Sequence, residues 1–226
     1  QWLEALDKYQ GSHTQAPNFA YDYCVERITE ERLTAFDLSK VEVFSNGAEP
    51  VQERTLAAFY RKFSRSGLRK SSLFPAYGLA EETLLVATKP ISSPPKTIRV
   101  DRRIFEKNGI ISISNRPSEK SVVSCGSPIL NTDVRVVDPQ TNEDVGEGVV
   151  GEIWVNSPAV AKGYWKDPAK TESVFSAKLS NDPSSGKYLR TGDLGFLFEN
   201  ELYPTGRIKD LLILNGVNIY PQDIET

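Results

Sequence analysis

The sequence contains no methionine, a single histidine and only two cysteines among its 226 residues. His13, Cys24 and Cys125 form no metal-ligand spacing and no histidine-based triad, so neither a zinc site nor a serine-hydrolase site is indicated. No apolar run approaches the ~20 residues of a membrane span, and no signal segment opens the chain. The formal net charge of −3 lacks the basic surplus of a nucleic-acid binder. We therefore expect a cytoplasmic globular protein with reduced cysteines.

The first third of the chain alternates between helix and strand patterns. Four apolar residues recur at the spacing of one helix face and predict a helix from Pro50 to Ser66: Leu56, Phe59, Tyr60 and Phe63. Shorter patterns predict helices over residues 1–9 and 18–25, the latter capped by Asn18, and strands over 41–44 and 72–74. A strand, a helix and a strand in this order are typical of a parallel α/β unit.

From Pro90 onward the pattern changes to short β-like runs separated by turn residues. These runs lie at residues 98–100, 110–113, 122–123, 134–137, 152–155, 194–198 and 211–214, with a helix near 168–175 and an Asn215-Gly216 hairpin turn. The sequence therefore predicts an α/β fold in three parts. An α/β subdomain at 1–88 precedes a β-rich, barrel-like subdomain at 89–205, and residues 206–226 form a hinge and the start of a further domain.

One glycine motif imitates a nucleotide-binding loop. Residues 146–151 match G-x-G-x-x-G, but the dinucleotide fingerprint requires a following helix, and Glu152 to Val155 read as a strand. A phosphate loop would also need a lysine where Glu152 stands. We interpret the stretch as a turn.

Two loops at predicted strand ends are stronger candidates. Asn46, Gly47, Ala48 and Glu49 follow one strand, and Tyr77, Gly78, Leu79, Ala80 and Glu81 follow the next. Because the carboxyl ends of neighbouring parallel strands carry ligands in α/β sheets, the two loops could border one cleft. Tyr77 offers a ring for a planar base, and Glu81 offers a hard oxygen ligand for Mg²⁺. Each loop alone could equally be a plain turn.

A second pair of motifs lies near the C-terminus. The carboxylate of Asp193 in Thr191-Gly192-Asp193 could accept both hydroxyls of a ribose, and Arg207 could donate to the same sugar or to a phosphate. Taken singly, these residues could also form a turn and a surface ion pair.

The order and spacing of all these motifs resemble the adenylate-forming superfamily of acyl ligases, adenylation domains and luciferases. The series runs through residues 46–49, 77–81, 151–155, 163–165, 190–193 and 206–213. Finer features resemble the fatty acyl-AMP ligases, namely residues 17–22, 46–50, 77–81, 123–126 and 218–225. The resemblance implies activation of a fatty acid with ATP and Mg²⁺ to an acyl-adenylate and pyrophosphate.

The resemblance also assigns a role to single residues. Gly47, Ala48 and Glu49 would border the adenine, on which Tyr77 would stack, while Asn46, Gly78, Leu79 and Phe196 would complete the nucleotide side. Ala80 stands where most of the superfamily has a threonine that contacts the α-phosphate. Glu81 would hold Mg²⁺, Asp193 and Arg207 would bind the ribose, and Lys209 would be the hinge of a mobile C-terminal domain.

The resemblance also implies an insertion at about residues 90–121, a feature of the acyl-AMP ligases. It is associated with transfer of the acyl group to the phosphopantetheine of an acyl carrier protein instead of coenzyme A. The superfamily's phosphate loop and its distal catalytic lysine are expected beyond the two ends of this sequence, so we expect the chain alone not to adenylate. An acyl-CoA ligase and a non-catalytic ligand-binding or scaffolding remnant remain as alternatives.

Overall fold

A five-stranded mixed sheet forms the centre of the first half of the chain. The computed structural model describes residues 1–114, 119–214 and 217–224. In spatial order the strands are β1 (His13–Ala16), β2 (Val43–Asn46), β3 (Leu73–Tyr77), β4 (Ala87–Thr88) and β7 (Ser127–Pro128). The first three strands run parallel, whereas β4 and β7 pair antiparallel. The parallel α/β unit predicted from the sequence is confirmed.

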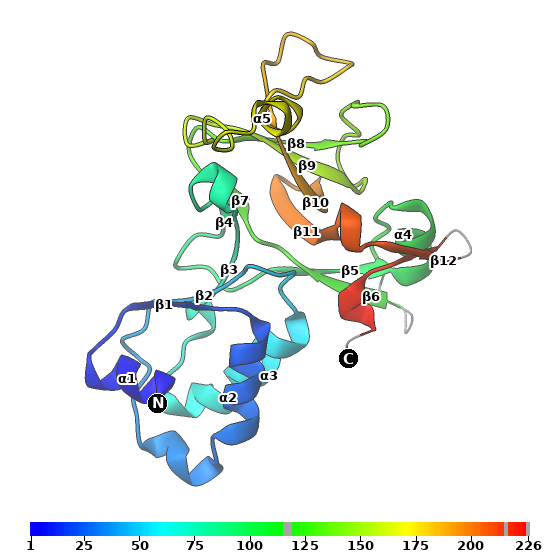
Figure 1. Cartoon of the computed structure of the whole chain (residues 1–226). Helices are drawn as coiled ribbons and strands as arrows, with labels where there is room; N and C mark the ends of the chain where they lie inside the picture. Colours follow the sequence, from blue (N-terminus) through cyan, green and yellow to red (C-terminus); the bar gives the residue numbers. More distant parts are fainter. Residues whose placement is uncertain (115–118, 215–216, 225–226) are drawn as a thin grey trace.

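Three helices cover the parallel strands on one side (Figure 1). They are α1 (Trp2–Lys8), α2 (Asn18–Arg27) and α3 (Glu53–Phe63). The apolar face of α3 buries Leu56, Phe59 and Phe63, as its spacing predicts. A 3-10 turn (Ser64–Ser66) follows this helix, and Gly67 ends the turn in the left-handed region with φ of 85°. The observed α-helix is therefore shorter at both ends than the predicted span.

The second half contains a four-stranded antiparallel sheet. Its order is β11 (Glu201–Arg207), β10 (Leu189–Phe198), β9 (Gly151–Asn156) and β8 (Asp133–Val137). Because β9 starts at Gly151, the rejection of the 146–151 motif as a dinucleotide fingerprint agrees with the structure. The prediction of a barrel is wrong, because within the described residues β8 and β11 remain edge strands and β7 joins the first sheet.

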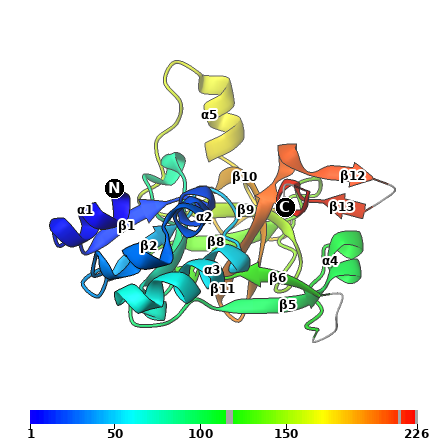
Figure 2. The same ribbon diagram turned by 90° about the horizontal axis from the view of Figure 1, so that it is seen from below.

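Two smaller ribbons flank this sheet (Figure 2). One pairs β5 (Thr97–Asp101) with β6 (Glu119–Val123), and the other pairs β12 (Leu212–Leu214) with β13 (Val217–Ile219). The predicted Asn215-Gly216 turn lies outside the described residues, but the strands on either side of it are antiparallel neighbours.

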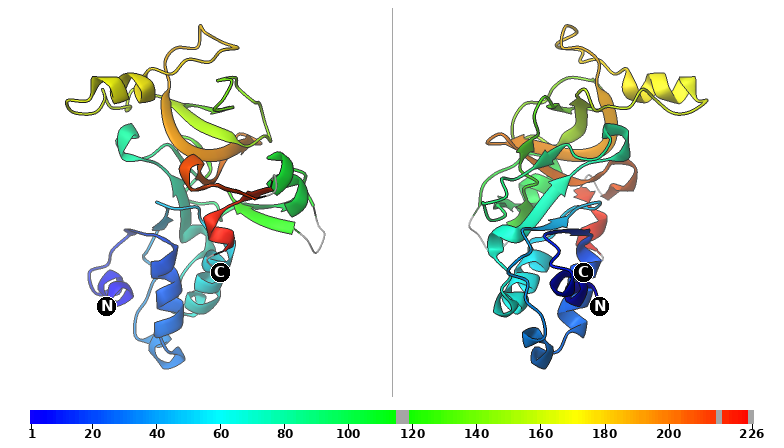
Figure 3. Two further views of the ribbon diagram at one scale, coloured as in Figure 1. Left: turned by 45° about the vertical axis from the view of Figure 1, so that its right-hand side comes forward. Right: turned by 90° about the vertical axis from the view of Figure 1, so that its left-hand side faces the viewer.

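The remaining helices lie in the second half of the chain. Helix α4 (Arg102–Asn108) follows β5 directly. The Asp101 side chain caps it by accepting hydrogen bonds from the backbone amides of Arg103 and Ile104. Residues 110–113, predicted as a strand, form only isolated bridges. Helix α5 (Pro168–Phe175) starts after its cap Asp167, as predicted, and lies at the periphery (Figure 3). No helix in the described ranges is long and apolar enough to cross a membrane.

Short 3-10 turns complete the described structure. They are η1 (Glu30–Thr34), η2 (Ser64–Ser66), η3 (Lys70–Ser72), η4 (Ala80–Glu82), η5 (Ile208–Asp210) and η6 (Pro221–Asp223). Two of them matter for the site below: η4 carries Glu81, and η5 follows Arg207 directly.

Candidate functional site

The carboxyl ends of β2 and β3 open onto a cavity of about 580 Å³. These strands are parallel neighbours with Asn46 opposite Pro75, so the loops that follow them emerge at the same edge of the sheet. Residues 48–49 and 77–81 of the two loops line the cavity. Its volume lies within the range of small-molecule sites, ~300–1,000 Å³.

The opposite wall is formed by β10 and β11. Asp193 and Arg207 face each other across these strands, next to an irregularity in the pairing of β10. The Asp193 carboxylate accepts a hydrogen bond of 2.8 Å from the Tyr77 hydroxyl and lies 3.1 Å from Nε of Arg207. Tyr77 and Asp193, which are 116 residues apart in the sequence, therefore meet in one cavity.

Burial governs the protonation of this pair. Burial raises the pKa of Tyr77 well above its ordinary value, and the nearby Asp193 charge adds to the effect. Burial also raises the pKa of Asp193, against the hydrogen bond from Tyr77 and the charge of Arg207, which both lower it. Tyr77 thus stays a protonated donor, and Asp193 is the acceptor.

An ion pair between the neighbouring strands β9 and β10 holds the irregular stretch of β10 that leads to Asp193. Glu152 is only 2% exposed. It accepts two hydrogen bonds from Arg190, of 3.0 and 2.7 Å, and one of 3.1 Å from the backbone amide of Gly192. The amide of Asp193 donates to the hydroxyl of Thr191 at 3.0 Å. Glu152 and Arg190 belong to the motif series recognised in the sequence, but no pattern in the sequence indicates this supporting role.

Asn18 ties the first loop to helices α2 and α3. Its side chain accepts a hydrogen bond from the buried Asn46 at 3.0 Å and donates to the carbonyl of Pro50 at 3.0 Å. Its backbone amide donates to the Glu49 carboxylate at 2.7 Å. The prediction of Asn18 as a helix cap is wrong, because Pro17 occupies the cap position and Asn18 is the first residue of α2. Ala48 adopts a φ of 70°, a strained value for a residue with a side chain.

Glu81 stands on η4 at the edge of the cavity. Oε1 of Glu81 accepts a hydrogen bond of 2.8 Å from the Tyr164 hydroxyl. The described residues hold no cluster of three or more acidic, histidine or cysteine ligands. A single carboxylate nevertheless suits Mg²⁺, which is commonly bound by one or two carboxylates together with substrate phosphates. The donor set is therefore compatible with Mg²⁺ bound jointly with a nucleotide.

Four of the predicted site residues do not line the cavity. Asn46 and Gly47 are buried beneath it, and a Cβ at Gly47 would come within 2.8 Å of the Ala76 carbonyl oxygen. Phe196 is fully buried in the core and stacks on Tyr203 with 4.9 Å between ring centres. Lys209 lies exposed on η5.

The other predicted residues line the cavity together with several that were not predicted. The predicted ones are Ala48, Glu49, Tyr77, Gly78, Leu79, Ala80, Glu81, Asp193 and Arg207. The additional ones are Pro50, Gln52, Ala76, Cys125, Pro204, Gly206, Asp210 and Pro221. Four of the eight additional residues, namely Pro50, Ala76, Gly206 and Asp210, are direct neighbours of predicted ones along the chain. Cys125 is a free, buried thiol whose pKa burial raises to about 12.

Comparison with known proteins identifies the class to which this fold and cavity belong. The family model described as AMP-binding enzyme matches residues 1–165. The chain therefore belongs to the AMP-binding enzyme family.

Two relatives show which members of the family this chain resembles. The chain is 45% identical to the medium-chain-fatty-acid–[acyl-carrier-protein] ligase JamA of Moorena producens over 230 residues, which are 100% of this chain and 38% of JamA. It is 42% identical to the 4-hydroxyphenylalkanoate adenylyltransferase of Mycobacterium marinum, covering 37% of that protein.

A solved structure is also similar to this chain. The fatty acyl-adenylate ligase of Legionella pneumophila, in complex with acyl adenylate and pyrophosphate, superposes with a TM-score of 0.86 and 47% identity. The match covers 92% of this chain and 36% of that one. The fold is thus that of the large domain of adenylate-forming enzymes, and the chain spans well under half the length of these relatives.

Proposed function

We propose that this chain forms the nucleotide-binding wall of an enzyme that activates a fatty acid as its acyl-adenylate. In this reaction a fatty acid carboxylate oxygen attacks the α-phosphorus of ATP. A carboxyl–phosphate bond forms, and the bond to the pyrophosphate leaving group breaks. The observation that carries the proposal is the meeting of Tyr77, Asp193 and Arg207 in one cavity at the strand ends.

The geometry gives each group a task in binding the adenosine part. The Tyr77 ring borders the cavity and offers a stacking surface to a planar base. Asp193 accepts from ribose hydroxyls, and the half-exposed Arg207 donates to the sugar or the phosphate. Mg²⁺ held between Glu81 and the phosphates would offset the charge that develops on the leaving pyrophosphate.

The charge of the cavity limits what the chain can do alone. Among the described residues of its wall, four are acidic, namely Glu49, Glu81, Asp193 and Asp210, and Arg207 is the single cation. Stabilising the charge that develops when the α-phosphorus of ATP is attacked needs more positive charge than this wall provides. We therefore expect the 226-residue chain to bind an adenylate and to release no pyrophosphate from ATP. Clear turnover in a pyrophosphate-release assay would contradict this.

The acceptor of the acyl group is proposed from the similarity to JamA and from the insertion that the sequence suggests at residues 90–121. The name of JamA specifies an acyl carrier protein, which favours a phosphopantetheine thiol over coenzyme A. This suggested insertion contains β5 and α4 and reaches the start of β6. Lys120, on that part of β6, forms an ion pair with Asp223 on η6. Product analysis of the complete protein with coenzyme A against a loaded carrier protein separates the two acceptors.

The nucleotide assignment is tested by binding of a stable acyl-adenylate analogue. Isothermal titration of the chain with an acyl-sulfamoyl adenosine should show binding that Asp193→Ala weakens by more than about tenfold, because a charged hydrogen-bond acceptor for the ribose is lost. Asp7→Ala on α1, outside the cavity, is the matched control and should bind normally. Equal affinity of wild type and Asp193→Ala, or no binding at all, would overturn the proposal.

An arylalkanoate is a second candidate for the acid. The 42% identity to the 4-hydroxyphenylalkanoate adenylyltransferase favours it. Competition between a fatty-acyl and a 4-hydroxyphenylalkanoyl sulfamoyl adenosine at the same site distinguishes the two acids.

A further inference from the structure

The turn that carries Glu81 is clamped by the segment between β9 and α5. The hydroxyl of Thr83 donates to the carbonyl of Ala159 at 2.9 Å, and the amide of Ala161 donates to the carbonyl of Glu81 at 2.8 Å. Thr83 has a φ of 68°, a left-handed value that is costly for a β-branched residue. A strained turn of this kind persists only when surrounding contacts hold it, and these two contacts do so.

Tyr164 adds a contact to the carboxylate itself. Its hydroxyl donates to Oε1 of Glu81 at 2.8 Å. Within the described part of the chain, Oε2 of Glu81 accepts no hydrogen bond, while Glu81 lines the cavity.

Helix α5 fixes the Tyr164 ring independently of its hydroxyl. The ring lies edge-on to Phe175 with 5.2 Å between centroids, and Nζ of Lys170 lies 4.5 Å from its centroid. The backbone amide of Tyr164 donates to the Thr171 hydroxyl at 2.9 Å. A phenylalanine at this position would therefore keep the packing and lose only the hydrogen bond to Glu81.

We propose that Tyr164 is a positioning residue for Glu81 in cation binding. Its hydroxyl occupies one carboxylate oxygen and leaves the other for a divalent cation shared with the nucleotide phosphates. Because a glutamate loses rotamer freedom when it binds a cation, a hydrogen bond that already orients the carboxylate lowers that entropic cost. The inference rests on the proposed nucleotide site.

The test measures cation binding and not turnover. Formation of the ternary complex of chain, Mn²⁺ and α,β-methylene-ATP is followed by water-proton relaxation. Tyr164→Phe should weaken Mn²⁺ binding about tenfold, as is typical when a residue that orients a metal ligand is lost. It should leave the affinity for the cation-free acyl-sulfamoyl adenosine unchanged.

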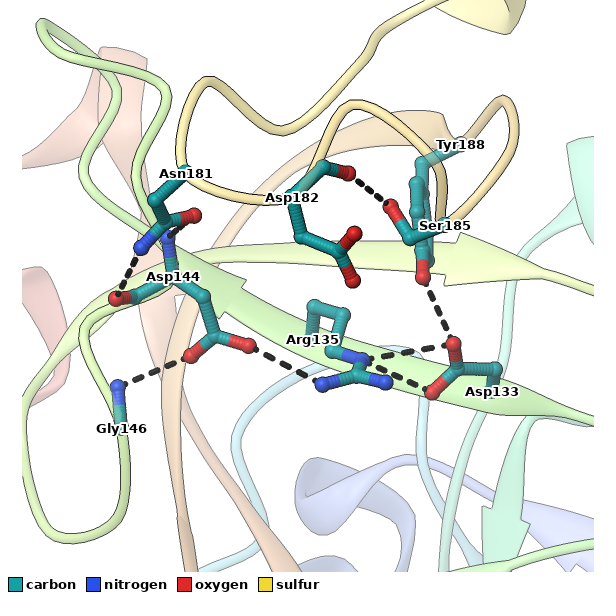
Figure 4. A network of polar contacts seen from close by, with 8 residues as sticks. All are labelled: Asp133, Arg135, Asp144, Gly146, Asn181, Asp182, Ser185 and Tyr188. Atoms are coloured by element: carbon teal, nitrogen blue, oxygen red, sulfur yellow. Dashed lines mark hydrogen bonds and ion pairs between the residues drawn. The ribbon is translucent and has the colours of Figure 1, made fainter.

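A matched control exists on the other side of the β-rich sheet. There the Tyr188 hydroxyl donates to Asp133 at 2.6 Å, within a network that also holds Arg135 (Figure 4). Tyr188→Phe removes the same kind of tyrosine–carboxylate bond without touching the cavity, and it should bind Mn²⁺ like wild type.

A double-mutant cycle separates positioning from general structural support. Glu81→Gln should weaken Mn²⁺ binding more than Tyr164→Phe, and the double variant should bind no worse than Glu81→Gln alone. Additive losses, unchanged Mn²⁺ affinity in Tyr164→Phe, or a wild-type chain that binds no Mn²⁺ would overturn the inference. If the acyl-sulfamoyl adenosine still binds in that case, the proposed function stands. If neither ligand binds, both fail.

Discussion

The two halves of the molecule bury different kinds of polar group. In the described residues before position 80, the buried polar side chains are all uncharged: Asn18, Asn46, Thr55, Ser66 and Ser72. After position 80 the buried set includes four ionisable residues: Glu82, Lys89, Lys120 and Glu152. Burying a charge is costly unless it is paired. The first half is thus built on apolar packing, whereas the second half also buries ionisable groups, of which Lys120 and Glu152 form ion pairs.

The site lies where these two halves meet. The helix-covered sheet supplies the loops after β2 and β3, and the β-rich half supplies Asp193, Arg207 and the clamp around Glu81. Apolar packing keeps the sheet edge in place, and ion pairs orient the groups that carry charge. Substitutions in the first half should therefore reduce stability, and substitutions in the second half should also change ligand binding and pH dependence.

The largest effect should come from the aromatic core of the first half. Phe59 is fully buried, with its ring 4.9 Å from Tyr21, 5.5 Å from Phe44 and 4.6 Å from Phe63. Phe59→Ala should lower the free energy of unfolding by about 3–5 kcal/mol, since it leaves a cavity among these rings. Urea denaturation measures the loss, and Tyr9→Ala at an exposed position is the control. A loss below about 1 kcal/mol would show that this cluster does not dominate the stability of the half.

The next effect should come from the buried ion pair of the second half. Glu152→Gln removes the partner of Arg190 and should cost about 2 kcal/mol, less than for a fully buried pair because Arg190 is 32% exposed. The Gly192 amide also loses its charged acceptor, so acyl-sulfamoyl adenosine should bind about tenfold more weakly. Glu4→Gln, which breaks an exposed ion pair with Arg32, is the control and should change neither quantity. If Glu152→Gln bound the analogue as tightly as wild type, the ion pair would not be needed to orient the groups of the cavity.

The first half was the easier one to predict from the sequence. The amphipathic spacing of α3 and the loops at the strand ends, each with one glycine, are local signals, and parallel pairing then brings the two loops to one edge. Strand β1 was missed because its residues, His-Thr-Gln-Ala, are polar or small, and its place follows only from pairing with β2. The sequence pattern also suggested Asn18 as a cap, whereas tertiary contacts with Asn46 and Pro50 use its side chain.

The second half was less predictable because its contacts join distant residues. Glu152 and Arg190 are 38 residues apart, and Tyr164 and Glu81 are 83 apart, so no local pattern announces either pair. The barrel prediction failed for a related reason, since short β runs do not reveal which sheet each strand joins. The resemblance recovered most of the cavity wall, but it also assigned Phe196 to the nucleotide side, whereas Phe196 packs in the core.

Lys89, one of the ionisable residues buried after position 80, should cause a smaller change in stability that depends on pH. Its ammonium group donates to the carbonyls of Ser71 and Pro90 and lies 4.6 Å from the Phe74 ring centre. Burial lowers the pKa of Lys89 to about 8 from 10.5. Between these two values the unfolded chain binds the proton and the folded chain does not, so stability rises as pH increases through this range. Lys89→Met removes this contribution.

The Lys89 effect is measured as a difference between two proteins. Urea denaturation at pH 7 and pH 10 should show that wild type gains about 1–2 kcal/mol relative to Lys89→Met as pH rises. Subtracting the two profiles removes the titration of all other groups. Parallel profiles would mean that Lys89 is not desolvated enough to titrate in this window.

The smallest effect should come from the basic residues at the end of α3 and beyond it. These residues, Arg61, Lys62, Arg65, Arg69 and Lys70, could steer an acidic carrier protein or form a solvated face. Three of them make contacts within the chain: Lys62 donates to the carbonyl of Val25, Arg65 pairs with Glu30, and Arg69 donates to the carbonyl of Val41. Such contacts favour a structural role over recruitment of a partner.

Charge reversal at Arg65 tests that interpretation. Because the Arg65–Glu30 pair is more than half exposed on both sides, Arg65→Glu should change the free energy of unfolding by less than about 1 kcal/mol. Binding of an acidic carrier protein to the chain should be unchanged at low and at high salt. A loss of carrier binding that appears at low salt and vanishes at high salt would instead establish electrostatic steering. Exposed charges of the first half would then act in partner binding, although its buried polar groups are uncharged.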